Sequence, residues 1–266
     1  MAPHGRVMVT DLDTRFLSDL AGLPGVQVRQ ADITSDPLPP DAFDLIHARA
    51  VLEHLPDREQ VISALAAGLR PGGVLLVEDT VIGGDFGRAA EPMVHPRRLA
   101  EAFIRVVEAV SAGFRAVGAD PRFGPRLPGL LNDTGLTRVG AAFVSRLVTG
   151  GSPESEFYTF TLAELSERLV AAGVLDAADA DLIGEMTLNP DARWPSLGLV
   201  IGVGVTENSL GTDYPANPHR PSRPHIDISA GSYLTDSTKP GMRNWCQPEP
   251  ASDTGKPAAC QRIHPE

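Results

Sequence analysis

The sequence of 266 residues predicts an α/β fold built on a doubly wound, mostly parallel sheet. Two observations carry this prediction. Short apolar runs recur between Arg6 and Glu78, and two of them, RVMVT and VLLVE, are apolar without alternation. Such runs are typical of strands that are buried on both faces. Helical segments and loops separate the runs, and strands that alternate with crossovers form parallel sheets with right-handed connections.

The elements of the first part of the chain follow one another in a regular order. Strands are expected at Arg6–Thr10, Val26–Gln30, Phe43–Ile46 and Val74–Glu78. A short helix at Thr14–Ala21 lies between the first two strands and ends at a turn that contains Gly and Pro. A second helix begins at Pro56, has apolar residues at helical spacing, and is stopped by Arg-Pro-Gly-Gly before the fourth strand.

The middle of the chain is predicted to be mainly helical. Ile82–Arg98 is rich in Gly and Pro and is expected to be a loop. Apolar residues recur at helical spacing from Leu99 to Val117, which predicts a long amphipathic helix that packs on the core. The remaining expected elements are a short helix ending within Leu130–Gly135, a strand at Val139–Val148, helices at Leu162–Ala172 and Asp176–Met186, and a closing strand at Ser196–Val205.

Composition divides the chain near Thr206. Every phenylalanine precedes this point, whereas both lysines and both cysteines, Cys246 and Cys260, follow it. The last part is rich in proline and contains no valine, so it lacks the apolar residues that a separate core requires. We therefore expect a folded domain at 1–206 and a disordered tail at 207–266. The two cysteines do not have a metal-ligand spacing.

The charge and hydropathy of the chain exclude several classes of function. The formal net charge is −11, which disfavours nucleic acid as a partner, because phosphate binding requires clustered Lys and Arg. No apolar run reaches the roughly 18 residues of a membrane-spanning helix. The first residues, MAPHGRVMVTD, lack the apolar core of a secretory leader. The sequence therefore predicts a cytoplasmic protein, disfavours nucleic acid and membrane as partners, and leaves the oligomeric state open.

Polar residues end three successive predicted strands, at Asp11, at Asp32 and at His47-Ala48-Arg49. The carboxyl ends of parallel strands meet at one edge of a sheet, which is where α/β folds bind ligands. A carboxylate at a strand end can accept hydrogen bonds from ribose hydroxyls, and a second one can accept from an adenine amino group. The three strand ends together would therefore form a pocket for an adenosine.

These motifs resemble a known family. VMVTDLD, QADITSDPLPPDAFDLIHARAVLEHL and ALAAGLRPGGVLLVED look like the second to fifth strand motifs of the class I S-adenosylmethionine-dependent methyltransferases that act on small molecules. The resemblance covers about 1–205, including the closing WPSLGLVIGVG. It implies a Rossmann-like sheet, S-adenosylmethionine as the cofactor and methyl transfer to a small-molecule acceptor.

The resemblance also assigns residues. It gives Asp11 to the ribose diol and Leu12 to a position beside the adenine. It gives Asp32 and Ile33 to the adenine, with the Ile33 backbone N–H facing a ring nitrogen. The segment His47, Ala48 and Arg49 matches the part that approaches the methionine end of the cofactor. No catalytic residue is assigned, because methyl transfer from a sulfonium depends mainly on how the acceptor is positioned.

The sequence departs from the family at its start. The family has a strand and a D-x-G-x-G-x-G loop before the acidic residue that matches Asp11, whereas only ten residues precede Asp11 here, with one glycine among them. The expected sheet is therefore N-terminally truncated. An alternative hypothesis follows, a non-catalytic methyltransferase-like remnant or partner subunit. A nucleotide-dependent oxidoreductase is disfavoured because no GxGxxG follows a first strand.

Each candidate also has a purely structural interpretation. Asp11 could cap the helix that follows it, although Asp13 is the better N-cap candidate. Asp32 could form an Asx-turn. His47 and Arg49 could be a hydrogen-bonded pair at a strand end.

Five other polar residues are more readily explained by structural roles than by chemistry. Glu53 and His54 favour a paired surface or core role over a metal site. A catalytic His95 has little support, and the Arg122 and Arg126 side chains are compatible with a solvated surface.

Overall fold

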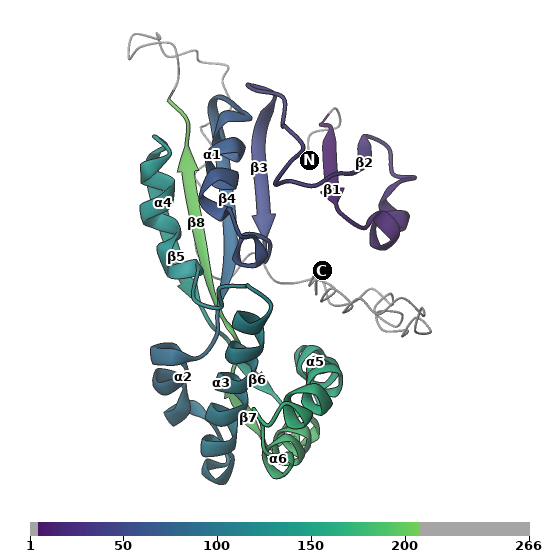
Figure 1. Cartoon of the computed structure of the whole chain (residues 1–266), viewed down its shortest axis with the longest axis vertical. Coiled ribbons are helices and arrows are strands. Elements are labelled where there is room, and N and C mark those ends of the chain that lie inside the picture. Colours follow the sequence, from purple (N-terminus) through teal and green to yellow (C-terminus); the bar gives the residue numbers. More distant parts are fainter. Residues whose placement is uncertain (1–4, 208–266) are drawn as a thin grey trace.

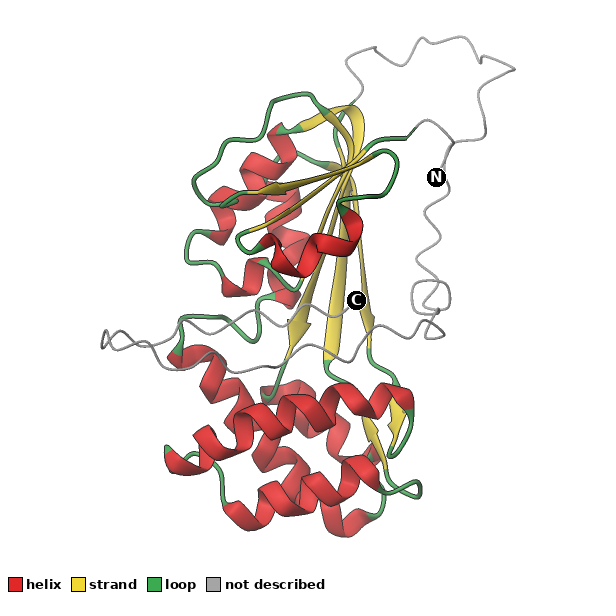
Figure 2. Cartoon of the chain, turned by 90° about the vertical axis from the view of Figure 1, so that its right-hand side faces the viewer, coloured by secondary structure: helices red, strands yellow, loops and turns green. Residues whose placement is uncertain are grey.

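A computed structural model describes residues 5–207, and the predicted disordered tail lies outside these residues (Figure 1). The described chain is an α/β protein with two parts. Strands and the helices α1 (Arg58–Ala67) and α4 (Leu127–Asp133) form one part. The other is a lobe of helices that lies beyond one end of the strands, as Figure 2 shows. No helix of residues 5–207 is long and apolar enough to cross a membrane.

The described strands form one sheet of four and two separate sheets of two. In the larger sheet the order is β3 (Phe43–Arg49), β4 (Leu69–Val81), β8 (Gly198–Val205) and β5 (Thr137–Val144). Only β3 and β4 are parallel, since β8 runs antiparallel to both of its neighbours. The α/β class is thus confirmed, but a mostly parallel sheet is wrong for this larger sheet. The closing strand lies between β4 and β5 and runs antiparallel to both.

The first two strands do not join that sheet. β1 (Val7–Asp11) and β2 (Val26–Gln30) are parallel to each other and form their own two-stranded sheet beside β3. The connection between them is a 3-10 helix, Thr14–Leu20. The prediction of a single doubly wound sheet is therefore wrong, because within residues 5–207 the β1–β2 pair has no hydrogen-bonded strand contact with β3.

Helices form most of the lobe (Figure 1). The expected long helix is α3 (Ala100–Ala116), and its buried side chains include Phe103 and Val106. The expected loop at Ile82–Arg98 contains α2 (Gly84–Ala90), so the prediction of loop throughout was wrong there. The remaining elements of the lobe are α5 (Pro153–Ala171), α6 (Ala177–Leu188) and the antiparallel pair of short strands β6 (Leu147–Thr149) and β7 (Arg193–Pro195).

Two hydrophobic clusters correspond to the two parts. One lies between the four-stranded sheet and its helices, with Leu75 and Val77 of β4 packed among Ile62, Leu65 and Phe123. The other holds the lobe together around the fully buried Trp194. The carboxyl ends of β3 and β4 point toward this lobe in Figure 1, so both clusters border the strand ends where the sequence places the site.

Candidate functional site

The ends of β1 and β2 bring the two predicted carboxylates to one edge. Asp11 is opposite Gln30 in the parallel register, and the backbone N–H of Ala31 donates to the carbonyl oxygen of Asp11 at 3.0 Å. Asp32 follows directly after Ala31. The sequence-based expectation that Asp11 and Asp32 share a sheet edge therefore agrees with the register of this two-stranded sheet.

Both carboxylates also take part in local turns. Asp11 Oδ1 accepts from the backbone N–H of Asp13 at 2.9 Å. Asp32 Oδ1 accepts from the backbone N–H of Thr34 at 2.9 Å and from its hydroxyl at 2.6 Å, which is the Asx-turn interpretation of this residue. Asp13 caps the following 3-10 helix by accepting from the backbone N–H of Arg15, as predicted. These turn contacts fix the orientation of both carboxylates at the strand ends.

The two apolar neighbours of these carboxylates lie in different environments. Leu12 is exposed beside the end of β1. Ile33 is partly buried and packs against the core of the larger sheet, so the connection after β2 fastens the small sheet to the large one.

A slot separates β1 from β3, and its cavity measures about 120 Å³. Met8 and Thr10 line one side, and Leu45, His47 and Ala48 of β3 line the other. Of the seven predicted cofactor residues, Ile33, His47 and Ala48 line this cavity. The two carboxylates and the His47–Arg49 segment are therefore on different sheets, which corrects the expectation that three strand ends on one sheet form the pocket.

His47 has a partner that the sequence analysis did not identify. Its Nε2 is 2.7 Å from Glu78 Oε1, on the neighbouring strand β4. Burial raises the pKa of Glu78, but the hydrogen bond with His47 and the charges of Arg49 and His47 outweigh burial and hold that pKa below its ordinary value. The pair therefore joins an ionised carboxylate to a half-exposed imidazole. The structural interpretation from the sequence was a His47–Arg49 pair, whereas the structure pairs His47 with Glu78.

A pair of buried acidic residues lies next to the His47–Glu78 contact in the sequence, because Asp79 directly follows Glu78 and Glu53 comes shortly after β3. Glu53 and Asp79 are both almost completely buried. Glu53 Oε2 accepts from the backbone N–H of Thr80 at 2.7 Å and from the Thr80 hydroxyl, and Asp79 Oδ1 accepts from the backbone N–H of Glu53 at 3.3 Å. Burial, and then the charge of Glu53, raise the pKa of Asp79 to about 8. Asp79 therefore carries a proton at neutral pH.

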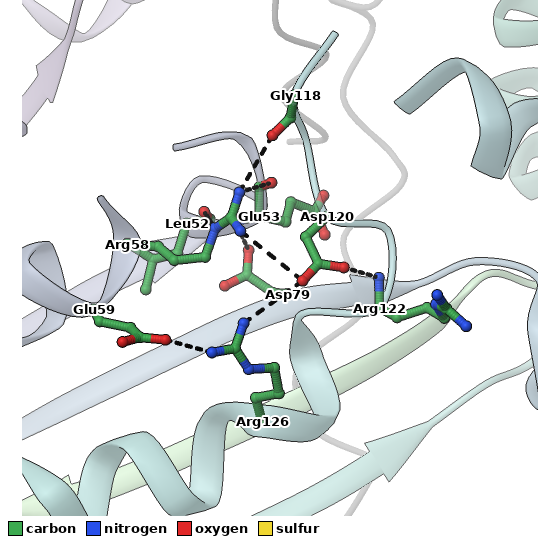
Figure 3. A network of polar contacts seen from close by, with 9 residues as sticks. All are labelled: Leu52, Glu53, Arg58, Glu59, Asp79, Gly118, Asp120, Arg122 and Arg126. Carbon is green, nitrogen blue, oxygen red and sulfur yellow. Dashed lines mark hydrogen bonds and ion pairs between the residues drawn. The ribbon is translucent and has the colours of Figure 1, made fainter. Parts of the chain in front are cut away.

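Figure 3 shows the polar network around this pair. The Arg58 guanidinium donates to the carbonyl oxygens of Leu52 and Glu53 at 3.2 and 3.4 Å, and also to that of Gly118. The Asp120 carboxylate forms ion pairs with both arginines: its Oδ2 lies 3.9 Å from Arg58 Nη1 and 3.7 Å from Arg126 Nη1. These contacts connect the segment after β3 to the loop that follows α3. They therefore stabilise the position of the end of β3, the strand that carries His47.

The other polar residues discussed in the sequence analysis make structural contacts. Glu53 lies in the core with His54 Nε2 at 3.4 Å from Glu53 Oε1. His95 pairs with Arg193 through the backbone, and Arg126 pairs with Glu59 at the surface. Among residues 5–207, no group of three or more His, Cys, Asp or Glu side chains is arranged to hold a metal ion.

A family model described as a methyltransferase domain matches residues 1–77, the part of the chain that contains all seven predicted cofactor residues. Residues 1–77 are therefore similar to a methyltransferase domain. The methyltransferase str3 of Strobilurus tenacellus is 31% identical over 156 residues, which cover 58% of this chain and 50% of that protein. A trans-aconitate 2-methyltransferase of Methylobacterium nodulans is 47% identical over 78 residues, which cover 29% of this chain and 30% of that protein.

The chain spans half or less of the length of the curated relatives just named. Among solved structures, the YcgJ protein of Bacillus subtilis is 14% identical with a TM-score of 0.45, and the match covers 76% of this chain and 83% of that one. The phosphoethanolamine N-methyltransferase 2 of Haemonchus contortus has the same identity and TM-score, over 76% of this chain and 44% of that one. TM-scores of 0.45 are too low to support an argument about the function of this chain.

Sequence reasoning missed Glu78, Asp79 and the buried role of Glu53. A signal for the first two was present, because both are acidic residues at the end of an apolar strand, the same pattern that pointed to Asp11 and Asp32. The pairing of Glu53 with Asp79 had no such signal, since the two residues are 26 positions apart and meet only when β3 and β4 align.

Proposed function

We propose that this chain transfers a methyl group from S-adenosylmethionine to a small-molecule acceptor. The observation that carries the proposal is the placement of Asp11 and Asp32 at one strand edge, within the part that matches the methyltransferase-domain model. Two carboxylates at the carboxyl ends of adjacent parallel strands suit a ligand with ribose and adenine groups. The cytoplasmic location expected from the sequence remains a prediction.

The residues at the strand ends fit the adenosine part of this cofactor. Asp11 would accept from the ribose hydroxyls, with Leu12 beside the ring. Asp32 and Ile33 would contact the adenine. Across the slot, His47 and Ala48 line the cavity, and together with Arg49 they would approach the amino-acid end of the cofactor. When bound, the sulfonium supplies an electrophilic methyl group, which leaves the protein the tasks of binding, orienting and excluding water.

His47 is the residue of this site best placed to move a proton. Its contact with Glu78 holds one ring nitrogen at 2.7 Å from a carboxylate oxygen, which fixes the orientation of the imidazole and leaves the other ring nitrogen to face a ligand. An acceptor that loses a proton during methylation would need such a base within hydrogen-bond reach. His47 is therefore the first side chain to test for acceptors with an acidic O–H or N–H.

A second candidate function is supported by the split sheet. A non-catalytic methyltransferase-like subunit would keep the strand order but lack a complete cofactor site. The slot between β1 and β3 favours this candidate, because its cavity of about 120 Å³ is smaller than the roughly 300–1,000 Å³ typical of cofactor sites.

Calorimetric titration with S-adenosylhomocysteine separates the two candidates. The methyltransferase proposal expects saturable binding, and it expects Asp11→Ala to weaken binding about ten-fold or more through loss of charge-assisted hydrogen bonds. Asp44→Ala is the matched control, because Asp44 is an exposed carboxylate on β3 that pairs with Arg70 instead of facing the strand ends. Absence of binding by folded protein would leave the non-catalytic candidate.

A further inference from the structure

A second cavity lies inside the helical lobe, away from the strand-end carboxylates. Its volume is about 70 Å³, several times the roughly 10–15 Å³ that admits one water. Helices α2, α3, α5 and α6 form its walls, and the segment between β7 and β8 closes one side. Ile82 also lines it, only four positions after Glu78 of the site above. The match to the methyltransferase-domain model ends at residue 77, before every lining residue.

The walls of this cavity are apolar. Among the described residues that line it, none carries a charged side chain. The hydroxyl groups present are mostly bonded within the protein: Tyr158 accepts from the backbone N–H of Leu197 at 3.0 Å, and Thr187 donates to a carbonyl oxygen at 2.9 Å. Burial raises the pKa of Tyr158 to about 12, so its hydroxyl stays neutral. A carboxylate in this cavity would therefore lose its hydration without gaining a cation, which is strongly unfavourable.

Aromatic side chains are concentrated around the cavity. Five of them line it, in a chain in which only 5% of the residues are aromatic. They are Phe86, Phe103, Phe157, Tyr158 and Trp194. Tyr158 and Trp194 meet edge to face, with ring centroids 5.7 Å apart. Rings in such arrangements favour flat, unsaturated partners.

One polar group of the lining has no partner. Trp194 is completely buried, and its Nε1–H has no hydrogen-bond partner among the described residues. A buried donor left unpaired is unfavourable by about 1–3 kcal/mol. This N–H is covered by apolar atoms, and no polar atom of the described lining faces the cavity, so a bound ligand would meet an entirely apolar surface.

We propose that this cavity binds the methyl acceptor through a neutral, flat, apolar group. The proposal rests on the methyltransferase function proposed above and adds the class of acceptor to it. The lining contains no cation to bind a polycarboxylate such as trans-aconitate, the compound named in several of the relatives. The acceptor class is therefore expected to differ from theirs.

Three small aromatic ligands of similar size test the cavity directly in the full chain. Anisole and ethylbenzene have almost the same shape, but only anisole has an oxygen that accepts a hydrogen bond. Benzoate is a charged comparison of similar size. Titration calorimetry is expected to show binding of anisole and ethylbenzene and no binding of benzoate. Because no polar atom of the described residues faces the cavity, the affinities of the two neutral ligands should agree within about three-fold.

A cavity-filling variant gives an independent test. A Cβ at Gly87 would have ordinary contacts of 3.8 Å with Ile104 and Val107, so the backbone accepts a side chain there. Gly87→Leu would occupy part of the cavity and should weaken anisole binding at least ten-fold. Gly129→Leu is the matched control, because Gly129 lies in the exposed part of α4 with open space around its Cβ position. Circular dichroism checks that both variants fold.

The possible outcomes separate this proposal from the function on which it rests. Binding of benzoate, no binding of anisole, or unchanged binding by Gly87→Leu overturns the acceptor assignment, whatever happens with S-adenosylhomocysteine. Methylation of trans-aconitate by this chain also overturns it while leaving the methyltransferase function intact. Anisole binding without any S-adenosylhomocysteine binding instead refutes the proposed function and removes the basis for calling the ligand an acceptor.

Discussion

The buried Asp79 makes a quantitative prediction about stability and pH. Asp79 is fully buried beside Glu53, and its Oδ2 has no hydrogen-bond partner among the described residues. Its pKa is about 8 in the folded chain, against an ordinary value of 3.8. The substitution Asp79→Asn removes the titration and keeps the shape of the side chain. The amide oxygen that it introduces can still accept from the Glu53 backbone N–H.

The sign of the effect follows from where the proton is bound. Between pH 3.8 and about 8 the folded state holds a proton on Asp79 that the unfolded state has released. Raising the pH through this window therefore favours the unfolded state, by about 1.4 kcal/mol per pH unit. From pH 5 to pH 7.5, a span of about 2.5 units, the wild type should lose about 3 kcal/mol relative to Asp79→Asn. Most domains have only about 5–15 kcal/mol in total, so the effect is large.

Urea denaturation at several pH values between 5 and 7.5 measures this difference. The two proteins should have similar unfolding free energies at pH 5, and Asp79→Asn should become progressively more stable toward pH 7.5. Asp44→Asn is the control, because it removes an exposed carboxylate and leaves the Glu53–Asp79 pair in place. A difference between wild type and Asp79→Asn that is constant with pH, or that changes in the opposite direction, would refute the buried protonated carboxylate.

The remaining predictions concern the His47 partner and backbone packing. Glu78→Gln should remove stability that the wild type has near neutral pH and loses as the pH falls through the lowered pKa of Glu78, so the two unfolding curves should converge in acid. Gly150→Ala should destabilise the fold by about 2 kcal/mol or more in urea denaturation, because its Cβ would lie 2.1 Å from the Asn189 carbonyl oxygen. Gly129→Ala, in open space on a helix, should instead stabilise by up to about 1 kcal/mol, and equal effects of the two substitutions would contradict the packing argument.

Several features of this protein were predictable from local sequence. The strands before Val81 occur close to their expected positions because each is a short apolar run bounded by turn residues. The turn at Asp13 was predictable, because an N-cap depends on the next few residues only. The common edge of Asp11 and Asp32 followed from the rule that parallel strands end together.

Other features depended on contacts between distant segments. Periodicity indicates that a segment is a buried strand, but it does not say which strand it pairs with or in which direction. The insertion of β8 between β4 and β5, and its antiparallel direction, could therefore not be read from SLGLVIGVGV. The same limit applies to the separation of β1 from β3, which places the predicted cofactor residues on two sheets.

The sequence alone therefore determined the resemblance to methyltransferases, the class of fold and the strand ends at which a ligand is expected. The tertiary structure alone decided the partners of the polar groups, namely Glu78 for His47 and Glu53 for Asp79. It also decided the apolar cavity of the lobe, which four helices and a strand connection build from residues between 82 and 197. The physical reason is that a pKa, an ion pair or a cavity arises from the spatial neighbours of a group, and most of these neighbours are far away in the chain.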